Sequence, residues 1–114
     1  MSLKTKKLGS SFVKEISLII LKEIKDPKIK FVTLTACDVT GDLSFAKVYF
    51  NMLNNEYKDE MTGILNKASS FIEMELSKVL ELRKMPKISF HWDESIEYGQ
   101  RIEEKLKEIK EKDA

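Results

Sequence analysis

Residues 26–50 read DPKIKFVTLTACDVTGDLSFAKVYF, and this stretch decides the fold. It contains two runs rich in β-branched and aromatic residues, joined by a tight turn with Gly41 and Asp42. Apolar side chains alternate along both runs: Val32, Leu34 and Ala36, then Ala46, Val48 and Phe50. This alternation predicts a β-hairpin that helices cover on one face. The stretch contains no nucleophile–base pair, metal-ligand spacing or phosphate loop, so it favours a binding surface over a reactive pocket.

Helical patterns precede and follow the hairpin. Residues 6–25 carry one apolar stripe at helical spacing, and Pro27 predicts the end of that helix because the residue before proline avoids the α region. The helical period returns over residues 56–82. Two serines interrupt that second pattern, and their hydroxyls compete for backbone hydrogen bonds. We therefore expect two helices, or one sharply bent helix, with the bend near Ser69.

A third strand is predicted after Pro86, where residues 87–93 alternate strictly and point Ile88, Phe90 and Trp92 inward. The element order is thus helix, strand, strand, helix, helix, strand. This order predicts one α+β domain over residues 1–95, in which helices cover one face of a three-stranded sheet. Residues 96–114 are expected to form a charged helical tail.

Composition limits the class of protein. A chain of 114 residues is one domain, and 42% hydrophobic with 34% charged residues fits a compact core with a heavily charged exterior. No apolar run approaches the length of a membrane span, and the first residues lack the apolar segment of a secretory signal. The single cysteine, Cys37, excludes an internal disulfide, so we expect a cytoplasmic protein.

Charge is unevenly distributed along the chain. Residues 1–30 carry eight lysines and three acidic residues, whereas residues 31–100 carry seven basic and eleven acidic residues. Residues 101–114 carry five of each sign. The asymmetry is compatible with a polyanionic partner at the N-terminal side and equally with lysines that only solubilise a surface helix.

No residue forms a recognisable catalytic or metal-binding group. His91, the only histidine, is expected on the outer face of the third strand without a nucleophile or companion ligand. Cys37 is expected to be a small structural residue within a strand, and Asp38 and Asp42 flank a turn. The four glycines are far apart and form no phosphate loop. The sequence therefore predicts no enzyme, cofactor, metal or small-molecule substrate.

Basic and small residues are the better candidates for a binding site. Together the basic side chains could neutralise several phosphates, and small residues at the predicted bend would let a sugar–phosphate backbone approach closely. The candidate RNA-contacting residues are Lys6, Lys7, Lys14, Lys28 and Lys30, then Lys67, Ala68, Ser69 and Ser70 at the bend, and Arg83, Lys84 and Lys87 around Pro86.

Several short motifs resemble one known family in their order and spacing. They are Asp26-Pro27, Val32-Thr33-Leu34-Thr35, Asp42-Leu43 and Ala46-Lys47-Val48-Tyr49 in the first half. In the second half they are Leu65-Asn66-Lys67-Ala68 with Phe71, Leu82-Arg83 with Pro86, and Phe90 with Asp93-Glu94-Ser95. Over residues 5–106 the chain resembles the bacterial ribosome-binding factor A family, and the element order matches the type II hnRNP K homology (KH) topology.

The resemblance implies a fold and a function. The fold would be KH-like, with an alanine-centred kink between helices in place of the GXXG loop. The protein would bind the small (30S) ribosomal subunit late in its maturation, acting on 16S rRNA near its 5′ and 3′ ends and supporting rRNA processing and growth in the cold. Members of the family are not enzymes, and a ribosome-dependent GTPase that releases the factor is an expected partner. We expect a monomer, because no exposed apolar seam argues for a dimer.

Two residues depart from the family pattern. The kink usually reads Ala-x-Gly, whereas Ser70 stands in the glycine position and lacks glycine's backbone freedom. Glu73 stands where the family often has a basic residue, which removes one phosphate contact. Both departures move the expected RNA-binding face toward the first helix and residues 83–87.

Two rival hypotheses come from other classes of function. A protein-interaction module could dock a partner through the hairpin, with Lys47, Tyr49 and Asn51 as the contact face, or through the charged tail. A small hydrolase would have to use Asp38, Asp42 or His91.

Overall fold

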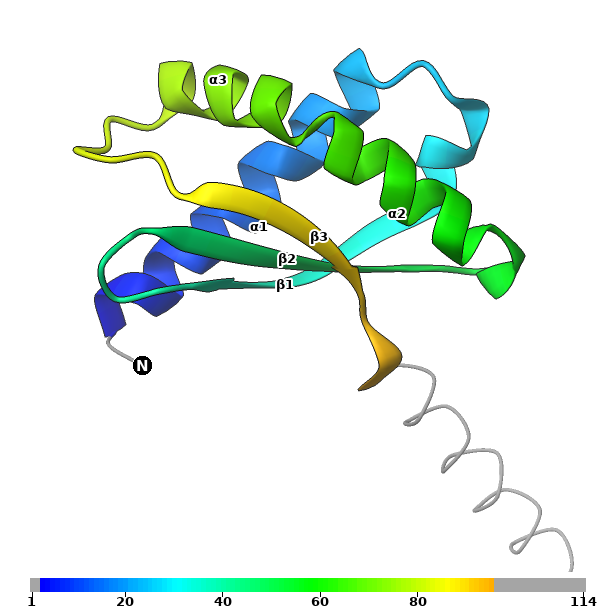
Figure 1. Ribbon diagram of the computed structural model, residues 1–114, viewed down its shortest axis with the longest axis horizontal. Coiled ribbons are helices and arrows are strands. Elements are labelled where there is room, and N and C mark those ends of the chain that lie inside the picture. The colour runs from blue at the N-terminus through cyan, green and yellow to red at the C-terminus, as the bar shows by residue number, and fades with distance from the viewer. Residues whose placement is uncertain (1–2, 96–114) are drawn as a thin grey trace, which may run out of the picture.

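The computed structural model describes residues 3–95, and its elements follow the predicted order (Figure 1). They are α1 (Leu3–Glu23), the 3-10 helix η1 (Pro27–Phe31), β1 (Val32–Val39), β2 (Phe45–Met52), the 3-10 helix η2 (Asn55–Tyr57), α2 (Lys58–Lys67), α3 (Ser69–Val79) and β3 (Lys87–Trp92). The α+β class is confirmed. The predicted tail, residues 96–114, lies outside the described residues. Within the described part, no helix is both long enough and apolar enough to cross a membrane.

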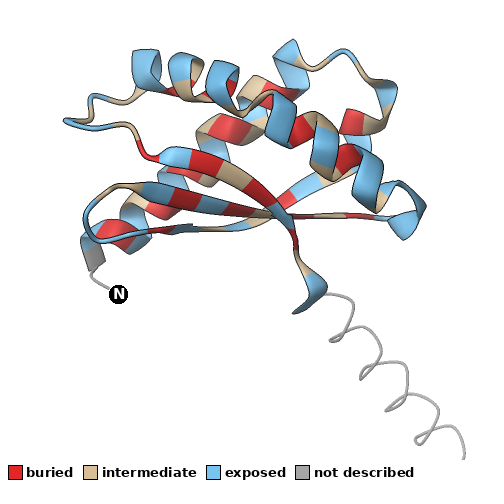
Figure 2. Cartoon of the chain, viewed as in Figure 1, coloured by how far each residue is buried: buried red, intermediate tan, exposed pale blue. Residues whose placement is uncertain are grey.

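The sheet has the strand order β1-β2-β3, with β1 and β2 antiparallel and β2 and β3 parallel. A parallel neighbour requires a crossover connection, and α2 and α3 supply it. All three helices lie on one side of the sheet, and their buried residues face it (Figure 2). The other face of the sheet carries no helix of the described part, as the sequence predicted.

A bulge in β1 corrects one predicted position. Leu34 pairs with Phe50 but Ala36 pairs with Tyr49, so Thr35 is an extra residue in β1. One extra residue reverses the inward and outward alternation beyond it. The prediction that Ala36 points into the core is therefore wrong: Ala36 is exposed, while Cys37 is half-buried against the core.

The hairpin turn also differs from the expected glycine turn. The N–H of Leu43 donates to the carbonyl of Thr40 at 2.9 Å, and Leu43 has φ 60°. No described glycine has a positive φ, so a leucine occupies the left-handed position in place of Gly41. This conformation costs an L-residue about 1 kcal/mol. The side chain of Asp42 offsets part of that cost, because its carboxylate accepts the Ser44 N–H at 3.0 Å.

Helix α1 ends before the proline that was predicted to stop it. Its last residue is Glu23, and Pro27 instead begins η1, where its fixed φ suits a first helical position. Asp26 caps η1 by accepting the N–H of Lys28 at 2.9 Å. The second helical pattern ends at Val79, short of the predicted residue 82, because Leu80 adopts an extended backbone.

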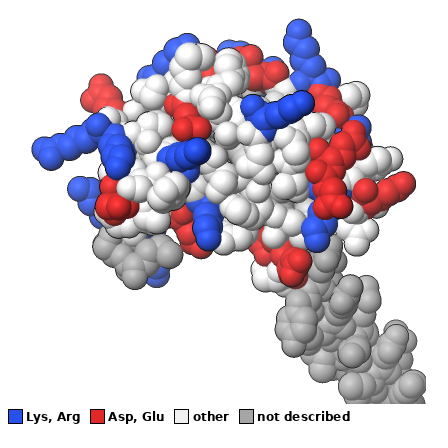
Figure 3. All heavy atoms as spheres, in the orientation of Figure 1, with Lys and Arg blue, Asp and Glu red and all other residues white. Residues whose placement is uncertain are grey.

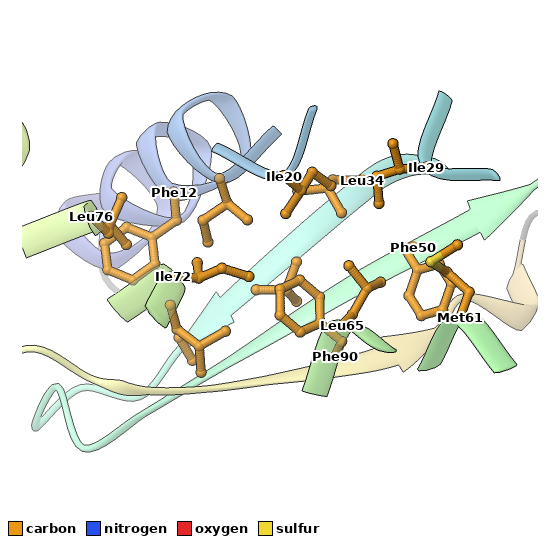
Figure 4. Packing of buried hydrophobic residues seen from close by; sticks show 14 of the residues in the cluster. Phe12, Ile20, Ile29, Leu34, Phe50, Met61, Leu65, Ile72, Leu76 and Phe90 are labelled. Carbon is orange, nitrogen blue, oxygen red and sulfur yellow. The ribbon is translucent and has the colours of Figure 1, made fainter. Parts of the chain in front are cut away.

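The hydrophobic core lies between the sheet and the helices. Phe12 of α1 packs near Leu76 of α3, and Phe50 of β2 lies near Met61 of α2 (Figure 4). All four side chains are completely buried. The core thus fixes the two helical segments, α1 and α2–α3, on the same sheet, and their outer faces and ends remain for binding.

Candidate nucleic-acid interface

A hollow of about 510 Å³ lies at one end of the domain, between the first turns of α1, the β1–β2 turn and the α3–β3 connection. We call it the basic hollow, and its charged residues are Lys4, Lys7, Glu81 and Arg83. In Figure 3, basic side chains project from the left end of the molecule, where the turn and the connection lie, and acidic side chains crowd the opposite end near the start of α2. Basic side chains thus gather at the end of the domain that holds the hollow, although acidic side chains also lie there.

The predicted lysines of α1 lie on two sides of that helix. Lys7 borders the basic hollow, whereas Lys6 borders a second hollow between α1 and β1. Lys14 follows Lys7 by about two helical turns and therefore lies on the same side as Lys7. All three are exposed. Lys4, which the sequence did not rank among the site residues, joins Lys7 at the hollow.

Lys28 is engaged by neighbouring carboxylates. Its Nζ lies 3.2 Å from Asp26 Oδ1 and 3.3 Å from Glu60 Oε1, and 5.4 Å from the centre of the Tyr57 ring. Hydrogen bonds to Asp26 and Glu60 raise the pKa of Lys28. A phosphate would have to compete with two carboxylates, so we infer that Lys28 mainly fastens η1 to α2. Lys30, at the end of η1, is exposed.

The predicted bend is present, with Ala68 at the junction between α2 and α3. Ala68 is half-buried, and Ser69 stabilises the junction because its hydroxyl donates to the carbonyl of Asn66 at 2.8 Å. Lys67 and Ser70 are exposed beside it. Lys67 and Ser70 are thus accessible at the junction, and Ala68 and Ser69 are accessible in part.

Asn66 ties this junction to the edge strand β3, a contact that sequence reasoning missed. Its Nδ2 donates to the carbonyl of Phe90 at 3.0 Å, and its Oδ1 accepts the N–H of Phe90 at 2.8 Å. Burial raises the pKa of Glu73, and a hydrogen bond from the Ile88 N–H and the charge of Lys87 partly offset that rise. Asn66 and Glu73 thus satisfy backbone groups on an edge that would otherwise be unpaired.

The α3–β3 connection is fastened to the hairpin turn. Pro86 is fully buried, and Arg83 borders the basic hollow. The Nζ of Lys84 donates to Ser44 Oγ at 3.2 Å, and the backbone N–H of Lys87 donates to the carbonyl of Ser44 at 3.0 Å. Ser44 therefore holds the connection beside the turn, and Arg83 next to α1.

The residues of the rival hypotheses lie on the sheet or in the turn. Tyr49 and His91 share the uncovered face with ring centroids 5.9 Å apart, and His91 Nε2 lies 2.8 Å from Ser89 Oγ. Hydrogen bonds from Thr40 and Ser44 lower the pKa of Asp42, so its carboxylate serves the turn. Within residues 3–95, no group of three or more His, Cys, Asp or Glu side chains could hold a metal ion.

These elements define a KH-like α+β domain with a helix–helix junction in place of a glycine-rich loop. The ribosome-binding factor A family model matches residues 4–106. Ribosome-binding factor A of Staphylococcus carnosus (strain TM300) is 41% identical over 112 residues, which covers 97% of each chain. The chain belongs to the ribosome-binding factor A family, as its motifs predicted.

Solved structures agree with this assignment. The solution structure of a Thermotoga maritima protein assigned as a ribosome-binding factor A has a TM-score of 0.68 and 29% identity, covering 80% of this chain and 88% of that one. A Thermus thermophilus ribosome-binding factor A, a homology model fitted into a cryo-electron microscopy map of its 30S complex, has a TM-score of 0.60. That protein is 19% identical, and the match covers 83% of this chain and 97% of the other, so it shows the fold.

Proposed function

We propose that this protein binds the free 30S subunit through 16S rRNA and supports late maturation and processing of that RNA, including in the cold. The observation that carries the proposal is the family match over residues 4–106. The Thermus thermophilus neighbour is described in a 30S complex, which agrees with the proposal. We further propose that the protein is a monomer of the cytoplasm without catalytic activity, and that a ribosome-dependent GTPase releases it.

Binding would depend on phosphate contacts made by exposed cations. Each contact releases condensed counterions from the RNA, so affinity should fall steeply as the salt concentration rises. Lys7 and Lys14 on one side of α1 and Lys6 on the other would grip separate phosphates. Arg83, at the basic hollow, would extend this surface toward the hairpin turn. The junction at Ala68 would admit a second stretch of backbone.

A charge-reversal experiment tests the role of α1. In co-sedimentation with 30S subunits at low salt, the triple variant Lys6→Glu/Lys7→Glu/Lys14→Glu should bind roughly tenfold more weakly or worse, because three phosphate contacts become repulsive. Lys25→Glu is the control, since Lys25 is exposed beyond the other end of α1. Circular dichroism should show the same folded signal for all proteins. An unchanged affinity of the triple variant would remove α1 from the interface.

The maturation role needs a separate test in cells. Depletion of the protein from its native host should cause precursor 16S rRNA to accumulate, more strongly at low temperature, and the wild-type chain should restore processing. Normal 16S ends after depletion at low temperature would contradict the maturation role and leave 30S binding standing.

A protein-interaction function is the second candidate. The uncovered sheet face carries Lys47, Tyr49 and Asn51, and Phe45 on the same strand is 55% exposed. A partner protein bound there should remain bound at high salt and after nuclease treatment, whereas binding through phosphates should not.

A further inference from the structure

The basic hollow has an apolar floor beneath its charged rim. Leu8 of α1, Leu43 of the hairpin turn and Leu82 of the α3–β3 connection all line it, and all three are half-buried. Its volume of about 510 Å³ lies in the range of pockets that hold a small organic group. The three leucines also pack against the hydrophobic core, so the hollow joins an apolar surface to a charged rim.

The turn places one of these leucines at a conformational cost. Leu43 has φ 60°, a left-handed backbone that favours glycine, asparagine or aspartate. The turn is nevertheless well ordered by hydrogen bonds, because Thr40 Oγ1 donates to Asp42 Oδ1 at 2.8 Å and accepts the N–H of Phe45 at 3.0 Å. Strained residues of this kind gather at ligand-binding positions. The leucine in this position contributes an apolar side chain to the floor of the hollow.

Cations surround the floor from two directions. Lys4 and Lys7 come from α1, and Arg83 comes from the α3–β3 connection. Glu81 is the one acidic residue at the hollow. Among the ion pairs of residues 3–95, none involves Lys7 or Arg83, so both cations can serve a ligand.

We propose that the basic hollow holds one unpaired nucleotide of the RNA, with its base on the leucine floor and its phosphate between the lysines. The planar guanidinium of Arg83 suits this role because it can stack on a base or bind a phosphate. The inference rests on the proposed function and adds to it a contact with a single-stranded segment. Duplex RNA would reach only the rim, because its bases are stacked inside the helix. An acidic peptide is the competing occupant.

Fluorescence anisotropy with the full chain tests the proposal. The probes are a labelled eight-residue oligouridylate, the same oligomer with abasic riboses in place of the bases, and a duplex RNA of equal charge. Asparagine tolerates the left-handed backbone, so Leu43→Asn removes one apolar side chain of the floor without straining the turn. Leu53→Asn is the matched control, since Leu53 is 94% exposed between β2 and η2.

Wild-type protein should bind oligouridylate more tightly than the abasic oligomer by roughly fivefold, the low end of base-stacking effects. Leu43→Asn should abolish that difference, while Leu53→Asn should retain it. Arg83→Glu should weaken binding of both oligomers. Equal binding of the two oligomers by wild-type protein, or tighter binding of a polyglutamate peptide than of oligouridylate, would overturn the nucleotide site.

The same samples separate this proposal from the proposed function. If wild-type protein and Leu43→Asn sediment equally with 30S subunits and neither distinguishes the oligomers, the nucleotide site is wrong and 30S binding stands. If wild-type protein fails to sediment with 30S subunits at low salt, the proposed function itself is wrong.

Discussion

Two glycines in helices should respond in opposite directions to the same substitution. Gly9 lies in α1 where that helix meets β1, and a Cβ added there would lie 2.5 Å from the carbonyl oxygen of Cys37. Gly63 lies in α2, and apart from its chain neighbours and the nearby backbone of the same helix no atom lies within 4 Å of its added Cβ. Gly9→Ala and Gly63→Ala therefore form a matched pair in which only the surroundings differ.

The magnitudes follow from two opposing effects. Alanine in a helix interior is favoured over glycine by about 1 kcal/mol, so Gly63→Ala should raise the free energy of unfolding by roughly 0.5–1 kcal/mol. At Gly9 the same gain is offset by a clash with backbone, which cannot rotate away as a side chain can. Overpacking of this kind costs about 1–3 kcal/mol, and the gain in helix propensity offsets part of it, so we expect a net loss of about 1–2 kcal/mol.

Thermal unfolding followed by circular dichroism measures both effects. For a domain of this size, 1 kcal/mol corresponds to roughly 4–8 °C in Tm, so Gly63→Ala should unfold a few degrees higher and Gly9→Ala about 10 °C lower. A Tm of Gly9→Ala equal to or above the wild-type value would refute the close contact between α1 and β1. Loss of stability in Gly63→Ala would refute the argument from helix propensity.

Three further changes test other contacts. Asn66→Ala should lower the free energy of unfolding by about 1–3 kcal/mol in urea unfolding, because it removes two hydrogen bonds to Phe90; an unchanged midpoint would refute the edge contact. Burial, and secondarily the charge of Asp38, raises the pKa of Cys37 to about 12. The thiol of the folded protein should therefore resist iodoacetamide at pH 8 and react once urea unfolds the chain. Rapid labelling of the folded protein would contradict the burial of Cys37. Burial raises the pKa of Asp93, but hydrogen bonds from Ser95 and Thr35 outweigh that effect and hold the pKa below its usual value. The free energy of unfolding should therefore fall as the pH drops below about 4. Asp93→Asn should flatten that pH dependence.

The order of elements could be predicted because each is long and has a clear period. The face of a residue within a strand could not, since one extra residue, Thr35, exchanged the positions of Ala36 and Cys37. The position of the turn was predicted, but its conformation was not. A glycine would be expected in the left-handed position, and Leu43 adopts it instead of Gly41. The hydrogen bonds of Thr40 and Asp42 hold this conformation, and the residue types of the turn do not show in advance which of them will form.

The candidate site shows the same limit. The bend at Ala68 could be predicted because small residues interrupt a helical stripe. The pairing of Asn66 with Phe90 joins residues far apart in the chain. The basic hollow likewise brings together Lys7, near the start of the chain, and Arg83, near the end of the described part. Lys28 was predicted from its charge alone, and only the structure shows the carboxylates of Asp26 and Glu60 beside it.

Co-sedimentation of the full chain with purified 30S subunits, 50S subunits and 70S ribosomes across a salt series shows whether the protein is a 30S-binding factor held by phosphate contacts. We expect stoichiometric binding to free 30S subunits alone, and log Kd should rise linearly with the logarithm of the salt concentration. No binding to 30S subunits at low salt, or equal binding to 50S subunits, would contradict it.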